Sequence, residues 1–153
     1  MKVDQQTRAV LAESTRWLIG ARITNYQFDD SVPESDDPAV REIYNQFLWL
    51  LYCDLREHRL IGTDKLSQAQ RVTAVRCVLF LKSGLPYLWP PLSRGQSALL
   101  TLGNLLTFGL AGRIYFRRLS SAGDMDYWPF LSQSQYAAAL GAPVYLSEAG
   151  AKN

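Results

Sequence analysis

The sequence of 153 residues contains a single histidine, His58, and only two cysteines, Cys53 and Cys77. One histidine cannot supply the repeated Glu-x-x-His ligands of a di-iron helical bundle. Two cysteines without paired spacing do not form a structural zinc site. The sequence also has no GxSxG motif and no reactive-cysteine signature. We therefore expect no metal site and no cofactor.

The chain also has little net charge. Sixteen basic and fourteen acidic residues give a net charge of +2 at pH 7, so no strong field is available to hold nucleic acid non-specifically. The first residues, MKVDQQTRAV, lack the apolar stretch that a signal peptide requires. Together with the low cysteine content, this predicts a cytoplasmic protein with two buried thiols.

What the sequence does contain is helical periodicity interrupted by glycine and proline. Asp37 before a proline, and Ser67 three residues before Gln70, are signals for the start of a helix. We expect an all-α fold, a single compact domain over residues 1–153, with room for a short strand near residues 114–116. The predicted helices, about five in number, span residues 4–18, 37–62, 67–84, 93–112 and 129–141.

Between the first two predicted helices lies the segment DDSVPESDD, which has five acids in nine residues. We interpret residues 23–37 as an acidic surface loop. It is either a solvated stretch whose last aspartate caps the next helix or a docking surface for a basic protein partner. The acidic candidates for partner binding are Asp29, Asp30, Glu34, Asp36 and Asp37.

Three tryptophans are further candidates for partner binding. Trp49 lies on the side of the second predicted helix that faces away from its main apolar stripe, where an exposed tryptophan would be a binding hot spot. Trp89 and Trp128 belong to the aromatic–proline segments PYLWPPLSR and DYWPF, and residues 85–93 form a connector rich in proline. Such segments either bind a partner or clamp a loop onto its own core.

The stretch from residue 95 to residue 112 has no charge, and three arginines follow within six residues. On a helical wheel its polar residues form a stripe opposite the leucines, which favours a soluble core over a transmembrane span. The core interpretation predicts burial of the leucine face, formed by Leu99, Leu102 and Leu106. The alternative is a peripheral membrane protein that uses the apolar and arginine-containing segment 98–118.

His58 is the one candidate for catalysis. If the second predicted helix extends to Gly62, Asp54 lies one turn before His58 and could orient its ring, as in a general-base pair. The other interpretation is a histidine at the C-terminal end of a helix, where the helix dipole favours its charge. The lack of a nucleophile motif favours the second interpretation.

The run SQSQYAAALGAPVYLSE resembles the second helix and the turn of a helix-turn-helix motif. The recognition helix would then be VYLSEAGAKN, which contains one lysine and no arginine, whereas DNA binding requires a basic face. We therefore expect no binding to nucleic acid. The sequence favours a non-catalytic helical module that binds another protein, as an adaptor or inhibitor, over membrane association or catalysis.

Overall fold

A computed structural model gives the fold and describes residues 3–90 and 121–141. In these two ranges the chain forms five α-helices, three short 3-10 helices and no strand, which confirms the predicted all-α fold. The predicted strand near residues 114–116 and the predicted leucine face lie outside the described residues. The α-helices are α1 (Gln5–Ile19), α2 (Asn25–Asp30), α3 (Pro38–Gln46), α4 (Gln68–Ser83) and α7 (Gln133–Gly141). The 3-10 helices are η1 (Leu48–Leu51), η2 (Gly62–Asp64) and η3 (Met125–Tyr127).

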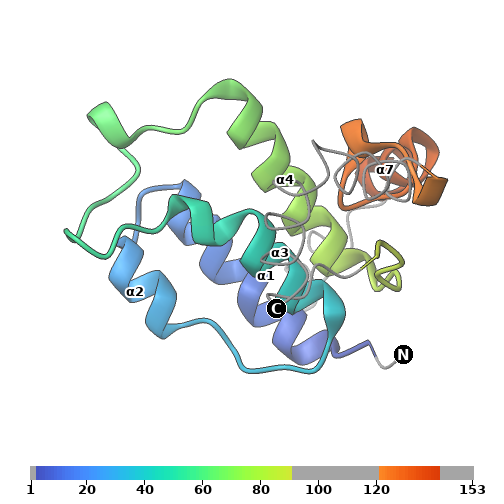
Figure 1. Cartoon of the computed structure of the whole chain (residues 1–153), viewed down its shortest axis with the longest axis horizontal. Coiled ribbons are helices and arrows are strands. Elements are labelled where there is room, and N and C mark those ends of the chain that lie inside the picture. Colours follow the sequence, from blue (N-terminus) through green and yellow to red (C-terminus); the bar gives the residue numbers. More distant parts are fainter. Residues whose placement is uncertain (1–2, 91–120, 142–153) are drawn as a thin grey trace, which may run out of the picture.

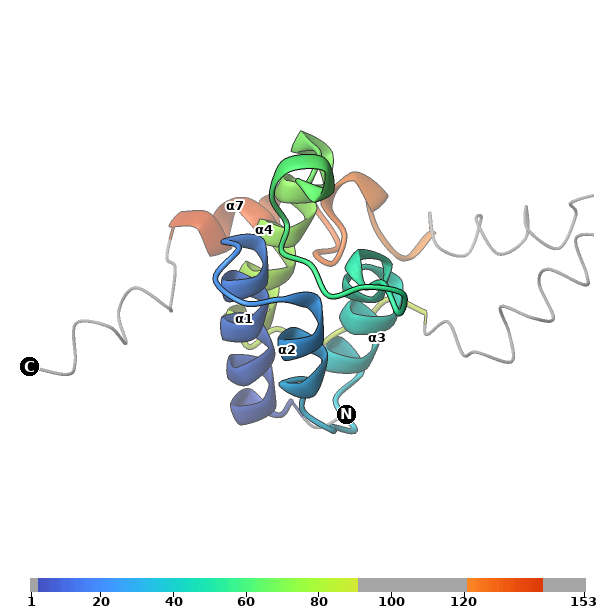
Figure 2. The same cartoon turned by 90° about the vertical axis from the view of Figure 1, so that its left-hand side faces the viewer.

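Helices α1 and α4 pack side by side at the centre of the molecule (Figure 1). Helices α2 and α3 pack against α1, and α7 packs against α4 (Figure 2). Helices α1, α3 and α4 each contribute fully buried side chains to the core, among them Leu11, Ile43 and Leu81. Burial of one such side chain stabilises the fold by about 1.5–3 kcal/mol.

The helix-start signals that the sequence contains are confirmed. The Asp37 side chain accepts a hydrogen bond from the first turn of α3, and Pro38 is the first residue of that helix. Ser67 and Gln70 form a capping box at the start of α4. Helix α4 ends, as predicted, at Gly84, whose positive φ of 70° favours glycine.

The second predicted helix is much shorter than expected. Helix α3 ends at Gln46, the 3-10 helix η1 follows, and residues 52–61 form no helix. The prediction of one helix as far as Gly62 was therefore wrong. From Cys53 onward a tertiary contact replaces the hydrogen bonds of a helix, because the buried side chain of Asn25 forms hydrogen bonds with the backbone of Cys53, Arg56 and His58.

The prediction of a single acidic surface loop over residues 23–37 was also wrong. This range contains α2, in which Thr24 and Gln27 form a capping box and Phe28 is buried. The Thr-x-x-Gln spacing is a readable helix-start signal, but the density of acids and turn-forming residues after it favoured a loop. The buried Phe28 and Asn25 side chains and the two capped N–H groups all contribute to the stability of this short helix.

The apolar side chains of α1 and α4 are buried only in part, and the first turns of α4 are largely exposed. Those that are buried include Leu11, Leu18, Val78 and Leu79, and those that are exposed are Val10, Trp17, Val72 and Val75.

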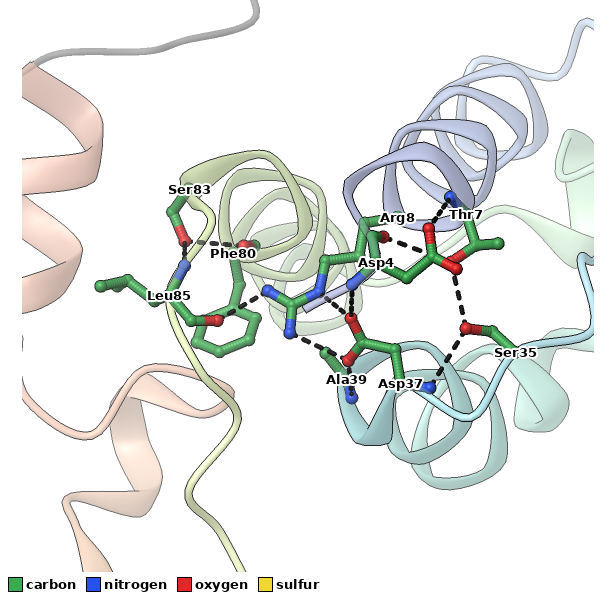
Figure 3. A network of polar contacts seen from close by, with 9 residues as sticks. All are labelled: Asp4, Thr7, Arg8, Ser35, Asp37, Ala39, Phe80, Ser83 and Leu85. Atoms are coloured by element: carbon green, nitrogen blue, oxygen red, sulfur yellow. Dashed lines mark hydrogen bonds and ion pairs between the residues drawn. The ribbon is translucent and has the colours of Figure 1, made fainter. Parts of the chain in front are cut away.

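A buried ion pair joins α1 to the start of α3 (Figure 3). The Arg8 Nε and Nη2 groups donate hydrogen bonds to the two carboxylate oxygens of Asp37, at 2.6 and 2.9 Å. The Arg8 Nη1 group donates to the carbonyl oxygen of Leu85 at 2.6 Å, and the guanidinium lies over the ring of Phe80. A single side chain of α1 therefore holds both the start of α3 and the end of α4.

Asp37 is only 2% exposed, so its assignment to a surface for partner binding was wrong. Burial by itself raises the pKa of a carboxyl group. Here the hydrogen bonds from Arg8 and from the backbone N–H groups of Asp4 and Ala39, with the charge of Arg8, outweigh burial and lower the pKa of Asp37 below its ordinary value. Asp37 is thus a charged structural residue.

We expect Asp37→Ala to lower the free energy of unfolding by about 3–5 kcal/mol, because it leaves Arg8 buried without its counter-ion. Urea denaturation followed by circular dichroism measures this loss. The matched control is Glu13→Ala, which removes an exposed ion pair with Arg16 and should cost less than about 1 kcal/mol. Equal losses for the two variants would contradict a structural role for the buried pair.

Acid should weaken the fold through the same carboxylate. Because the pKa of Asp37 is lower in the folded than in the unfolded state, its contribution to stability is present above the ordinary pKa of aspartate. This contribution is lost as the pH falls through the lowered folded-state pKa. We expect Asp37→Asn to unfold with a weaker dependence on pH than the parent chain below about pH 4. Urea denaturation at several pH values in that range measures the free energy of unfolding of both chains. If this free energy depended on pH equally in both, Asp37 would not be a source of the acid sensitivity.

Candidate interaction surface

A chain of aromatic rings runs from the surface into the core. Trp49 on η1 is 46% exposed, and its ring stacks on that of Tyr52, with centroids 5.3 Å apart and planes at 20°. Tyr44 contacts Trp49 from α3 at 6.1 Å, and Tyr26 contacts Tyr52 from α2 at 5.9 Å. Aromatic pairs with such geometry contribute about 0.5–1.5 kcal/mol beyond the burial of their area. The rings therefore hold one another in fixed orientations.

The inner end of this chain is anchored in the core. Tyr44 stacks on the buried Phe28 of α2, with ring centroids 6.5 Å apart. The Tyr44 hydroxyl donates a hydrogen bond of 2.5 Å to the carboxylate of Asp29. Helices α2 and α3 are thus joined directly beneath the exposed ring of Trp49.

The loop that carries Tyr52 is held by Asn25, which is 1% exposed. The Asn25 amide nitrogen donates hydrogen bonds to the carbonyl oxygens of Cys53 and Arg56, at 3.0 and 3.1 Å. Its Oδ1 accepts one from the backbone N–H of His58 at 2.7 Å, and its backbone N–H donates to the His58 carbonyl oxygen at 3.0 Å. Residues 52–58 are therefore tied to the start of α2.

Carboxylates surround these rings. Asp30 and Asp54 are exposed, and Asp29 lies at the end of α2. Desolvation and the negative charges of Asp29, Asp54 and Asp30 raise the pKa of Tyr52, so these carboxylates create a negative potential at its ring. We call the whole set the aromatic–acidic surface. It consists of Tyr26, Tyr44, Trp49, Tyr52, Asp29, Asp30 and Asp54.

The structure brings together only some of the residues that the sequence singled out. Asp29, Asp30 and Trp49 all belong to the aromatic–acidic surface. Glu34 and Asp36 are exposed on the linker that precedes α3. Only the first part of the acidic segment therefore lies beside the aromatic rings.

The aromatic–proline segments pack on each other. Trp89 is 3% exposed and its indole N–H donates a hydrogen bond of 2.9 Å to the carbonyl oxygen of Pro129. The half-buried Trp128 donates to the Tyr87 hydroxyl at 3.2 Å. The prediction that Trp89 binds a partner was wrong, and of the two interpretations, the clamp onto the protein's own core is the one that these contacts support.

The proposed pair of Asp54 and His58 does not form. Neither residue lies on a helix, and the Nδ1 atom of His58 contacts the carbonyl oxygen of Arg56 at 3.3 Å instead. His58 serves the fold through its backbone, which pairs with Asn25. The acid–base geometry inferred from helical spacing was wrong because the helix ends before either residue.

Sequence reasoning missed Asn25, Tyr26 and Tyr52 as residues of this site. Asn25 and Tyr26 fell within the predicted loop of residues 23–37, and Tyr52 lay within the predicted helix of residues 37–62. The capping box at Thr24 was the available signal, because it starts a helix whose second residue is Tyr26. The ring stacking had no local signal, since it depends on where the second helix ends.

Comparisons with protein families, with curated proteins and with solved structures returned no match to this chain. Among residues 3–90 and 121–141, no helix has the length and apolar character needed to cross a bilayer. The segment 98–118, considered for membrane contact, lies outside these ranges. The chemistry of the aromatic–acidic surface is therefore the basis for a functional proposal.

Replacing Asn25 should release the loop that supports Tyr52. We expect Asn25→Ala to cost about 2–4 kcal/mol of unfolding free energy, because it leaves buried backbone groups of Cys53, Arg56 and His58 without partners. Hydrogen exchange should show faster exchange at the His58 amide. The control is Gln27→Ala, which removes only half of an exposed capping box and should cost about 1 kcal/mol or less. Unchanged protection at His58 would contradict this role.

Proposed function

We propose that this chain is a non-catalytic protein-interaction module that binds a basic segment of a partner protein on the aromatic–acidic surface. The observation that carries the proposal is the half-exposed indole of Trp49, held rigid between Tyr44 and Tyr52. Tryptophan and tyrosine dominate the energetics of protein interfaces, because they bury a large area with few rotatable bonds.

Exposed aliphatic side chains extend the apolar part of this region. Leu50 is adjacent to Trp49 in η1, Leu55 lies in the loop that Asn25 holds, and both are strongly exposed. Burial of each by a partner would add to affinity at about 25 cal/mol per Å² of apolar area. A fixed aromatic centre with aliphatic neighbours and a charged margin is the anatomy of a protein interface.

The charge of the surface selects the partner. Asp29, Asp30 and Asp54 are grouped around Tyr52. In the neighbouring segments, Arg56 pairs with Asp64 and Arg41 with Glu42. A basic partner would meet the negative charge of these three carboxylates, which would raise its association rate and orient its approach.

We place this interaction in the cytoplasm. Cys53 and Cys77 are both free thiols, which supports a reducing compartment. Burial raises the pKa of the Cys77 thiol and keeps it protonated and unreactive.

Matched substitutions test the proposed function. We expect Trp49→Ala to weaken binding of a partner captured by the parent chain and cross-linked to the aromatic–acidic surface by at least about thirtyfold, because truncation of a central tryptophan typically costs about 2 kcal/mol or more. Asp30→Asn with Asp54→Asn should slow association. Surface plasmon resonance with the identified partner measures both effects.

The chain provides close controls. Trp17 is 41% exposed on α1, a helix that contributes no residue to the aromatic–acidic surface, so Trp17→Ala should leave binding unchanged. Glu34→Gln with Asp36→Asn removes the same charge from the linker before α3 and should slow association less. Asp37 must be left intact, because its loss would weaken the fold. Equal effects of Trp17→Ala and Trp49→Ala on partner binding would refute the proposed surface.

A further inference from the structure

Trp49 is stacked on Tyr52 and is still 46% exposed. The two planes lie within 20° of each other, and Trp49 is also contacted from the side by Tyr44 at an interplanar angle of 59°. These contacts fix the indole while nearly half of it stays exposed. A partner group that lies flat on the indole therefore loses no affinity to reorganisation of the site.

Negative charge lies near this aromatic cluster, because the Tyr26 hydroxyl, whose ring contacts Tyr52, donates a hydrogen bond of 3.0 Å to the backbone carbonyl oxygen of Asp54. Asp30 and Asp54 come from different segments, the end of α2 and the loop held by Asn25, and both are exposed. The carboxylate of Asp29 already accepts the Tyr44 hydroxyl. Asp30 and Asp54 thus have hydrogen-bonding capacity for an incoming donor.

We propose that the basic segment of the partner is anchored by an arginine, whose guanidinium stacks on the exposed part of Trp49 and is attracted by the neighbouring carboxylates. This inference rests on the proposed function and specifies the residue that the surface recognises. A guanidinium is planar, weakly hydrated and carries several N–H donors in one plane, so it can stack and pair at the same time. A lysine ammonium is compact and strongly hydrated, so it gains less from a flat aromatic surface.

The test uses three peptides on one glycine–serine scaffold, with arginine, lysine or citrulline at the same positions. Citrulline keeps the planar shape of arginine and removes its charge. Each peptide is titrated into the full chain labelled with ¹⁵N, and the tryptophan indole N–H signals are followed by NMR. Trp49→Phe assigns the signal of Trp49 among the four tryptophans of the sequence.

We expect the arginine peptide to shift the Trp49 indole signal and to bind at least about threefold more tightly than the lysine peptide. The citrulline peptide should bind weakly or not at all. Asp30→Asn with Asp54→Asn should reduce the preference for arginine over lysine, whereas Glu34→Gln with Asp36→Asn should preserve it. The peptide comparison uses the unmodified chain, so it does not depend on whether a variant folds.

The outcomes of these experiments distinguish failure of the arginine anchor from failure of the proposed function. Equal binding of the arginine and lysine peptides, lost in Trp49→Ala, would overturn the arginine anchor and leave the proposed function intact. No binding of either peptide, together with partner capture that survives Trp49→Ala, would overturn both. Self-association of the chain that Trp49→Ala abolishes and the arginine peptide does not compete would assign the surface to a second copy and also overturn the arginine anchor.

Discussion

The ion pair of Arg8 and Asp37 is the contact on which the positions of the other elements depend. Removing two charges from water is costly, and this cost is offset only where every donor and acceptor has a partner. Here the guanidinium is bonded to both carboxylate oxygens and to the carbonyl of Leu85, and Asp37 also caps α3. The pair therefore fixes where α3 begins, and with it the direction in which η1 carries Trp49.

The described helix starts that follow local rules could be predicted from the sequence. Asp37 before proline, and Ser67 with Gln70, are satisfied within one turn of chain, so their signals are local. The end of the second helix could not be predicted, because the run FLWLLYC suits a helix. At the end of this run the backbone is not helical, and the side chain of Asn25, 28 residues earlier in the chain, donates a hydrogen bond to the carbonyl oxygen of Cys53. A tertiary contact of that range leaves no mark on helical periodicity.

The exposure of the tryptophans in the candidate site could likewise not be predicted from the sequence. Trp49 and Trp89 are similar as sequence features, since both lie among aromatic and aliphatic residues. Trp89 is buried because Pro129, 40 residues later, accepts its indole N–H, and Phe80 and Phe130 pack edge to face in the same part of the core. Trp49 has ring partners on only part of its surface. Which tryptophan is available to a partner depends on contacts that only the folded chain defines.

The buried contacts of Arg8 with Phe80 and Asp37 can be compared with the exposed arginine contacts that we propose at Trp49. Arg8 lies over the ring of Phe80, 5.7 Å from its centroid, and pairs with Asp37 away from water, where breaking the pair is strongly unfavourable. Asp30 and Asp54 are exposed, so in the interaction proposed above salt would screen their attraction and each ion pair would contribute little on its own. Stacking on the indole would then provide most of the affinity, and the acids would mainly select and orient a cation. A partner bound in this way would associate quickly and dissociate readily.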